Sequence, residues 1–150
     1  MLSFRKPVTV VAMSPELVFR LVNAGALMAW VLLIVAPAWY VTRAVVRSGL
    51  WPAVLASAYL ALLLIRLPQW PSDGSFSSLG GVAALFRDPW GLLTGWVHYL
   101  CFDLLVGLWI VGEAESRGIT PVKRAPALVL TFLFGPVGWL AWLLTRRLAA

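Results

Sequence analysis

Residues 95–113, GWVHYLCFDLLVGLWIVGE, decide the fold of this chain. The stretch has the composition and about the length of a membrane-spanning helix, which needs roughly 20 mainly apolar residues. It also carries the only histidine of the chain, His98, and an aspartate, Asp103, near its middle. Because an ionisable side chain at bilayer depth costs about 3 kcal/mol or more, these two residues are candidates for a functional site.

The overall composition agrees with a membrane protein. Of the 150 residues, 61% are apolar and 12% are charged, whereas a typical soluble chain has about 25% charged residues. We therefore predict a single all-α integral membrane domain over residues 1–150. The net charge of +6 is spread over loops and helix ends without a basic face, which argues against nucleic-acid binding and favours membrane lipids as partners.

Apolar runs separated by short polar segments predict a bundle of four transmembrane helices. Ser14-Pro15 and Asp88-Pro89 each combine a capping side chain with proline at the first helical position, so each starts a helix. The run at 79–86 is too short to span and predicts a short interfacial or re-entrant helix between the second and third spans. The four expected spans are 15–42, 50–67, 89–116 and 126–146.

Four crossings place both ends of the chain on one side of the membrane, and the basic residues do not then decide the orientation. On the side of the chain ends lie Arg5, Lys6, Arg66, Arg87, Arg146 and Arg147. On the other side lie Arg43, Arg47, Arg117, Lys123 and Arg124. The two sets are too similar in size for the positive-inside rule to choose between them.

The rise of a helix allows polar residues on different spans to be compared in depth. Asn23 and His98 lie at similar depths in their spans. Arg20 and Arg66 fall in the same half of the bundle, so we expect all four side chains to line one polar pocket. For Arg20, an ion pair with Glu16 four residues earlier is an equally good interpretation.

Asp103 lies about 21 Å from the start of its span, near the membrane midplane. The antiparallel fourth span brings Gly135-Pro136 to about the same level, where a backbone freed by proline offers Asp103 a hydrogen-bonding environment. His98 and Asp103 are about 140° apart around their helix, so a direct dyad is not expected. A purely structural aspartate is the alternative, but the small gain from polar contacts between membrane helices favours a function.

Other residues of the third span have simpler interpretations. Glu113 stands four residues before Arg117, so a structural ion pair at the helix end is favoured over a catalytic role. Glu115 is expected to be solvated. The aromatic residues near the ionisable groups are candidate walls of a ligand site, and they are Trp96, Tyr99 and Trp109.

The sequence lacks the motifs of several enzyme classes. One cysteine, Cys101, and one histidine do not make a transition-metal site within a single chain. Cys101 lies in an apolar helix and is interpreted as a small buried side chain. There is no P-loop, dinucleotide or zinc-protease motif, so no metal and no cofactor is predicted.

Several motifs together resemble one known family. They are Asn23-Ala24, Leu79-Gly80-Gly81-Val82, Gly95-Trp96-Val97-His98-Tyr99-Leu100 with Phe102-Asp103, Arg117-Gly118-Ile119, and residues 130–136. With these motifs the chain resembles the abscisic-acid-deficient-4-like membrane proteins, which are neoxanthin-synthase-like. The resemblance is densest between residues 79 and 147. It implies a small four-span protein linked to carotenoids.

The resemblance also implies a reaction. The plant step converts violaxanthin to neoxanthin, an isomerisation that opens an epoxide and generates an allene. That step needs an acid and a base but no redox cofactor, and in this chain Asp103 is the candidate acid and His98 the candidate base. Asn23, Arg20, Trp96, Tyr99 and Trp109 are candidate substrate contacts. The alternatives are a non-catalytic assembly factor that holds a pigment or lipid and, more weakly, a purely structural membrane protein.

The sequence departs from the plant pattern in one respect. No plastid transit peptide is recognisable before the first span. We therefore expect a multi-pass protein of the bacterial inner membrane type. Many such hosts make no neoxanthin, so the expected ligand is a carotenoid or another isoprenoid lipid.

Overall fold

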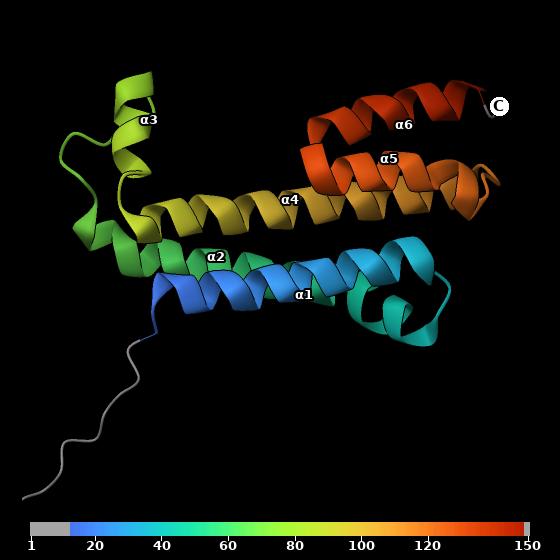
Figure 1. The fold of residues 1–150 in the computed structure, drawn as a ribbon, viewed down its shortest axis with the longest axis horizontal. Coiled ribbons are helices and arrows are strands. Elements are labelled where there is room, and N and C mark those ends of the chain that lie inside the picture. The colour runs from blue at the N-terminus through green and yellow to red at the C-terminus, as the bar shows by residue number, and fades with distance from the viewer. Residues whose placement is uncertain (1–12, 149–150) are drawn as a thin grey trace, which may run out of the picture.

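A computed structural model describes residues 13–148, and every regular element in that range is helical (Figure 1). Helices long and apolar enough to cross a membrane are α1 (Pro15–Val35), α2 (Leu50–Arg66) with its 3-10 extension η2 (Leu67–Gln69), and α4 (Pro89–Ser116). Shorter elements are the π-helical η1 (Thr42–Arg47), α3 (Leu79–Leu85), α5 (Pro121–Phe134) and α6 (Pro136–Leu148). The long helices expose many large apolar side chains, as surfaces in contact with lipid do. The predicted all-helical fold is confirmed, with three candidate spans.

Capping contacts confirm the predicted starts of α1 and α4. Ser14 Oγ accepts a hydrogen bond from the Leu17 amide at 3.2 Å. Asp88 Oδ2 accepts from two amides in the first turn of α4, at 3.1 and 3.0 Å. Both helices continue with proline at a position where no amide hydrogen is needed. As a result α4 has the expected bounds, 89–116.

The first helix is shorter than predicted. The sequence predicted a span over 15–42, but α1 ends at Val35, two residues before Pro37. Proline lacks an amide hydrogen and restricts the residue before it, so the helix stops here instead of bending. The chain then turns, forms η1, and enters α2 through Gly49, whose φ of +85° favours glycine.

The expected fourth span, 126–146, is not a continuous helix. Gly135, with a φ of +46°, ends α5, and Pro136 starts α6 in a new direction. The two helices fold back on each other along the second half of α4 (Figure 1). A Cβ on Gly138 would lie 2.1 Å from the Thr131 nitrogen, so the two backbones approach as closely as glycine allows. The four-span prediction is therefore not confirmed, because a helical hairpin replaces the last span.

Each arm of this hairpin is too short to cross a bilayer. The two arms have 14 and 13 residues, which at 1.5 Å per residue gives about 20 Å, against roughly 30 Å of hydrocarbon. The hairpin therefore returns to the end of the bundle where it starts. Figure 1 shows α6 finishing beside the end of α4 and far from the start of α4.

The central helix is α4, which contacts α1, α2, α5 and α6. Its buried Leu104 and Ile110 belong to one apolar core with Trp30 of α1 and Trp142 of α6. Gly107 lets Trp30 reach the α4 backbone, since a Cβ there would lie 2.5 Å from the ring. The predicted short helix between the second and third spans is present as α3, with 7 residues. Its interfacial or re-entrant position in a membrane stays a prediction.

Candidate functional site

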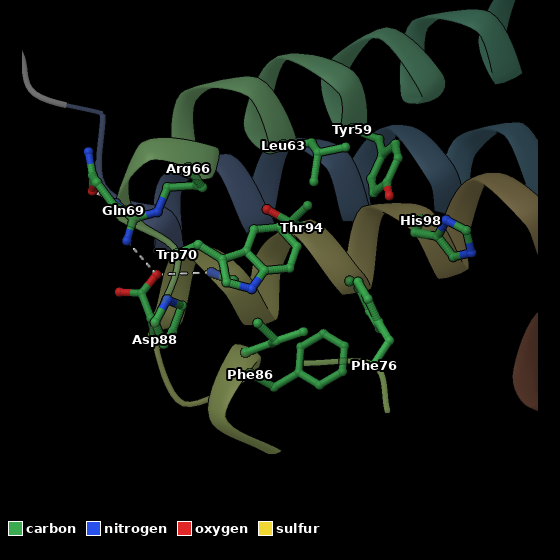
Figure 2. Close-up of a pocket in the computed structure, with 14 residues that line it drawn as sticks. Tyr59, Leu63, Arg66, Gln69, Trp70, Phe76, Phe86, Asp88, Thr94 and His98 are labelled. Carbon is green, nitrogen blue, oxygen red and sulfur yellow. Dashed lines mark hydrogen bonds and ion pairs between the residues drawn. The ribbon is translucent and has the colours of Figure 1, made fainter. Parts of the chain in front are cut away.

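A cavity of about 330 Å³ lies at the start of α4, beside the end of α2 and the residues that flank α3 (Figure 2). Figure 2 shows side chains from these segments facing one shared space. The aromatic residues that line it are Tyr59, Trp70, Phe76 and Phe86. The polar or ionisable residues that line it are Arg66, Gln69, Asp88, Thr94 and His98. The cavity is thus mainly apolar, with polar groups at its two ends.

Arg66 and Asp88 form an ion pair at one end of the cavity. Arg66 Nη2 lies 2.8 Å from Asp88 Oδ2, and the other terminal nitrogen donates to the Gln69 side chain. The same carboxylate oxygen caps α4, so it holds both the helix start and the guanidinium. The sequence predicts Asp88 only as a cap. Its contact with Arg66 has no local signal, because α2 and α4 meet only in the folded protein.

His98 lies at the other end of the cavity, toward α2. Its ring centroid is 5.3 Å from that of Tyr59 and 4.6 Å from that of Phe102. The side chain is exposed, and no group within the described part of the chain hydrogen-bonds to its ring. A neutral imidazole has one donor and one acceptor nitrogen, so both are available to a ligand in the cavity.

Two glycines one turn apart on α4 shape the wall of the cavity. A Cβ on Gly91 would lie 2.2 Å from the Leu85 carbonyl oxygen, and a Cβ on Gly95 would lie 2.4 Å from Phe86 Cε1. Such distances are far below normal packing contacts, so each position requires the absence of a side chain or a shift of its neighbour. The two glycines let the end of α3 and the Phe86 ring rest directly on α4.

The single polar pocket predicted from the sequence is not formed. Of its four expected residues, Arg66 and His98 line the cavity, whereas Arg20 and Asn23 do not. Arg20 is exposed and pairs with Glu16 at 2.9 Å, which is the alternative that their spacing predicted.

Rotation about α4, and not depth, separates Asn23 from His98. Asn23 Oδ1 accepts a hydrogen bond from Trp96 Nε1 at 3.1 Å. Trp96 and His98 are two positions apart, which is about 200° around a helix. Thus α1 packs on the face of α4 that carries Trp96, while Tyr59 of α2 contacts His98. Depth along the helices alone does not determine which residues meet, because the rotation of each residue about its helix also decides its contacts.

Asp103 is buried, at 9% exposed, and faces the break between α5 and α6. A Cβ on Gly135 would lie 2.7 Å from Asp103 Oδ1. This confirms the prediction that Asp103 and Gly135 lie at about the same depth along the bundle. Asp103 Oδ2 has no hydrogen-bond partner among residues 13–148. Asp103 does not line the cavity that holds His98, in agreement with the expectation that the two form no dyad.

The aromatic residues predicted as ligand walls also lie outside the cavity. Trp96 contacts α1, and its ring centroid is 5.4 Å from that of Tyr99. Trp109 packs on Trp139 of α6, with ring centroids 4.4 Å apart. The rings that do line the cavity come mainly from α2 and from residues 70–86. Their irregular spacing along the sequence carried no signal of a shared site.

A second polar cluster lies at the end of α4. Glu113 Oε1 is 2.8 Å from Arg117 Nη2 and 2.9 Å from Arg146 Nη1. Glu113 Oε2 accepts a hydrogen bond from Trp142 Nε1 at 2.6 Å. The Arg117 contact has the geometry that the sequence predicted. The two contacts from α6 were missed because they exist only when the hairpin folds back.

Glu115 is not simply solvated, as the sequence predicted. It pairs with Arg47 of η1 at 2.5 Å and with Arg124 of α5 at 3.5 Å. The Arg124 side chain is only 2% exposed, and it also donates to the Val111 carbonyl at 3.3 Å. Glu115 therefore provides the counter-charge that a buried guanidinium needs.

The residue types most suited to a transition metal are not brought together. Among residues 13–148, no group of three or more His, Cys, Asp or Glu is placed to hold a metal ion. Cys101 is buried, and its Sγ lies 3.5 Å from the Pro52 carbonyl oxygen.

Comparison with known proteins gives two matches. A family model described as ABA DEFICIENT 4-like matches residues 17–142. Protein ABA DEFICIENT 4, chloroplastic, from Arabidopsis thaliana is 26% identical over 137 residues, which cover 87% of this chain and 61% of the relative. No solved structure matches the chain. The expectation of a bacterial inner membrane is contradicted, because the matched relative is a chloroplastic plant protein.

Proposed function

This chain belongs to the ABA DEFICIENT 4-like family, and on that basis we propose that it binds the ring end of a carotenoid or related isoprenoid lipid in the cavity and isomerises it. The family is involved in neoxanthin and abscisic-acid biosynthesis. The chloroplastic relative supports a plastid membrane as the place of action. The chain spans 61% of that relative, so carrying an activity over from it is part of the proposal.

The size and lining of the cavity support this ligand class. Its volume of about 330 Å³ is near the lower end of the roughly 300–1,000 Å³ typical of ligand pockets. A carotenoid is much longer than such a cavity, so one cyclic end group enters while the polyene lies along the lipid-facing side of the helices. The aromatic walls suit an apolar ring. Arg66 and Gln69 at one end supply donors for an oxygen substituent.

The proposed chemistry moves protons and exchanges no electrons with a cofactor. A base removes the proton from the first polyene carbon beside the ring. The released electron pair forms a double bond between this carbon and the neighbouring ring carbon, in addition to the polyene double bond that the carbon already has. The bond between that ring carbon and the epoxide oxygen breaks at the same time. An acid then protonates that oxygen, so the product is an allenic alcohol with the formula of the substrate.

We assign the base to His98 and the acid to Tyr59. Both residues line the cavity, and their ring centroids are 5.3 Å apart. A neutral imidazole is a suitable base near pH 7, and a phenol donates a proton that the protonated imidazole then returns. Asp103, the acid expected from the sequence, lies outside the cavity. It remains the alternative acid for a substrate that reaches the hairpin break.

The test is expression in a host that accumulates violaxanthin, followed by pigment chromatography and mass spectrometry. We expect a new pigment with the mass of violaxanthin. His98→Gln and Tyr59→Phe should each lower its yield about 100-fold, a typical acid–base contribution. Asp103→Asn should retain most of the yield. Loss in Asp103→Asn with full activity in Tyr59→Phe would assign the acid to Asp103, and no new pigment with the wild type would exclude the isomerase.

A non-catalytic pigment-binding or assembly protein is the second candidate. It is favoured by the Arg66–Asp88 pair, because a cavity whose charges are compensated is suited to hold an apolar group without reacting with it. In that case the purified protein carries an unchanged pigment. Absence of bound pigment from the purified wild-type protein, together with absence of a new pigment from the cells, would contradict both candidates.

A further inference from the structure

The hairpin gathers basic residues at one end of the molecule. Because α6 returns to the end of α4, Arg146 and Arg147 lie at the same end as η1 and the start of α5 (Figure 1). A continuous fourth span would have carried both arginines to the opposite end. We call the end formed by η1, the end of α4, the start of α5 and the end of α6 the basic end.

The two ends of the molecule differ in net charge. Seven Lys or Arg side chains and two Glu side chains lie at the basic end, which leaves a net charge of about +5. We call the opposite end of the molecule, which holds the cavity, the cavity end. Within residues 13–148 its charges cancel, because three arginines pair with three acidic side chains: Arg20 with Glu16, Arg66 with Asp88, and Arg87 with Asp73. The fold therefore creates a charge asymmetry that a four-span arrangement lacks.

Part of the basic charge holds the helices together. Glu113 is shared by Arg117 and Arg146, and Glu115 is shared by Arg47 and Arg124. Each glutamate thus faces two guanidinium groups, so each cluster keeps a positive charge. These four arginines are fixed by the fold and shape the potential of the surface.

Three further basic side chains are free to bind a partner. Arg43, Lys123 and Arg147 are exposed, and none of them forms an ion pair within residues 13–148. They come from η1, α5 and α6, so they surround the fixed cluster on separate elements. Their removal should not disturb the packing, which makes them suitable for substitution.

We propose that the basic end is a binding surface for anionic lipid headgroups of one leaflet. The ends of membrane-spanning helices lie level with the headgroups, where clusters of Lys and Arg bind acidic lipids. Trp39 and Tyr40, which are 47% and 69% exposed, lie just before η1, where aromatic residues commonly anchor a helix end at the interface. The helices that carry the basic residues expose apolar side chains, which fits a lipid surface and not a nucleic acid. The inference is independent of the proposed function.

The experiment compares the full chain in detergent with added phosphatidylglycerol or phosphatidylcholine. A lipid that binds the folded protein raises the thermal midpoint, and we expect phosphatidylglycerol to raise it by at least about 4 °C more than phosphatidylcholine. The triple variant Arg43→Gln, Lys123→Gln, Arg147→Gln should lose at least half of that difference. The control at the cavity end, Arg20→Gln with Arg87→Gln, removes two charges and should keep the difference.

Two outcomes would overturn the proposal. One is a wild-type protein that does not distinguish the two lipids, and the other is a triple variant that keeps the full difference. An equal loss in the control variant would also overturn it, because the effect would then follow total charge and not this surface. Circular dichroism of each variant at low temperature checks that the helices are intact.

Discussion

The start and the end of α4 differ in how closely they are packed and in how their charges are used. At the start, α4 meets α1, the end of α2 and the flanks of α3, and a cavity remains between them. At the end, η1, α5 and α6 surround the helix, and two glutamates bind four arginines. The first end is suited to admit a ligand, and the second holds the bundle together. One helix therefore carries a cavity near Thr94 and an ion-pair cluster at Glu113 and Glu115, about 30 Å apart along its axis.

The largest expected effect concerns the side of the membrane on which α6 ends. In a Cys101→Ala background, Thr120→Cys, Leu148→Cys and Ser72→Cys are labelled with a membrane-impermeant maleimide in sealed vesicles. Because the hairpin returns to its starting end, positions 120 and 148 should label from one side and position 72 from the other. A continuous fourth span would instead make position 148 label together with position 72.

The next effect is on the hairpin itself. Gly138→Ala places a Cβ against the backbone of Thr131, so we expect the free energy of unfolding to fall by about 2–3 kcal/mol, as for other overpacked sites. Chemical denaturation in detergent measures it. The control is Gly112→Ala on α4, where a Cβ meets no atom within 4 Å. Equal losses in both variants would show that close backbone approach does not hold the hairpin.

Removing the charge of Glu113, which two arginines share, should destabilise the protein somewhat less than Gly138→Ala. Glu113→Gln removes the charge that faces Arg117 and Arg146, and we expect the free energy of unfolding to fall by about 2 kcal/mol. Hydrogen exchange should rise mainly in α6. Glu16→Gln, which affects an exposed pair, should change stability by less than about 1 kcal/mol. Unchanged exchange in α6 would separate the Glu113 cluster from hairpin docking.

The smallest effect on stability belongs to the cavity end. Gly95→Ala pushes against the edge of the Phe86 ring, which can turn away, so we expect less than about 1 kcal/mol of destabilisation. The displaced ring changes the shape of the cavity and should lower pigment binding several-fold. Gly80→Ala on α3, with nothing within 4 Å, should leave pigment binding unchanged. Normal binding in Gly95→Ala would argue against this cavity as the ligand site.

The elements with local signals were predictable from the sequence. Asp88-Pro89 gave the start of α4 because capping and proline geometry act within one turn. Gly135-Pro136 also indicates an interruption of the helix. However, the same two residues fit both a bend within one span and a reversal into a hairpin. The choice depends on the fit between Gly138 and Thr131 and on the Arg146–Glu113 contact. Both are tertiary contacts that no single segment contains.

The candidate site was predictable only in part, for a related reason. Depth along a span placed Arg66 and His98 in the same region, and both line the cavity. Depth says nothing of rotation, so Asn23 was placed with His98 although it contacts Trp96. Tyr59 was missed because a single tyrosine on an apolar helix has no distinguishing pattern. Its proximity to His98 arises from the packing of α2 on α4.

The break at Gly135 also determines the shape that the protein presents to a bilayer. Among residues 13–148, α1 and α2 are the long helices beside the first half of α4, whereas α5 and α6 are added along its second half (Figure 1). The protein therefore occupies more area in one leaflet than in the other, and it acts as a wedge. A bilayer adapts to such a shape by deforming at a modest cost. We expect the chain to favour membranes that are convex on the side of the basic end, which its distribution between small and large vesicles would reveal.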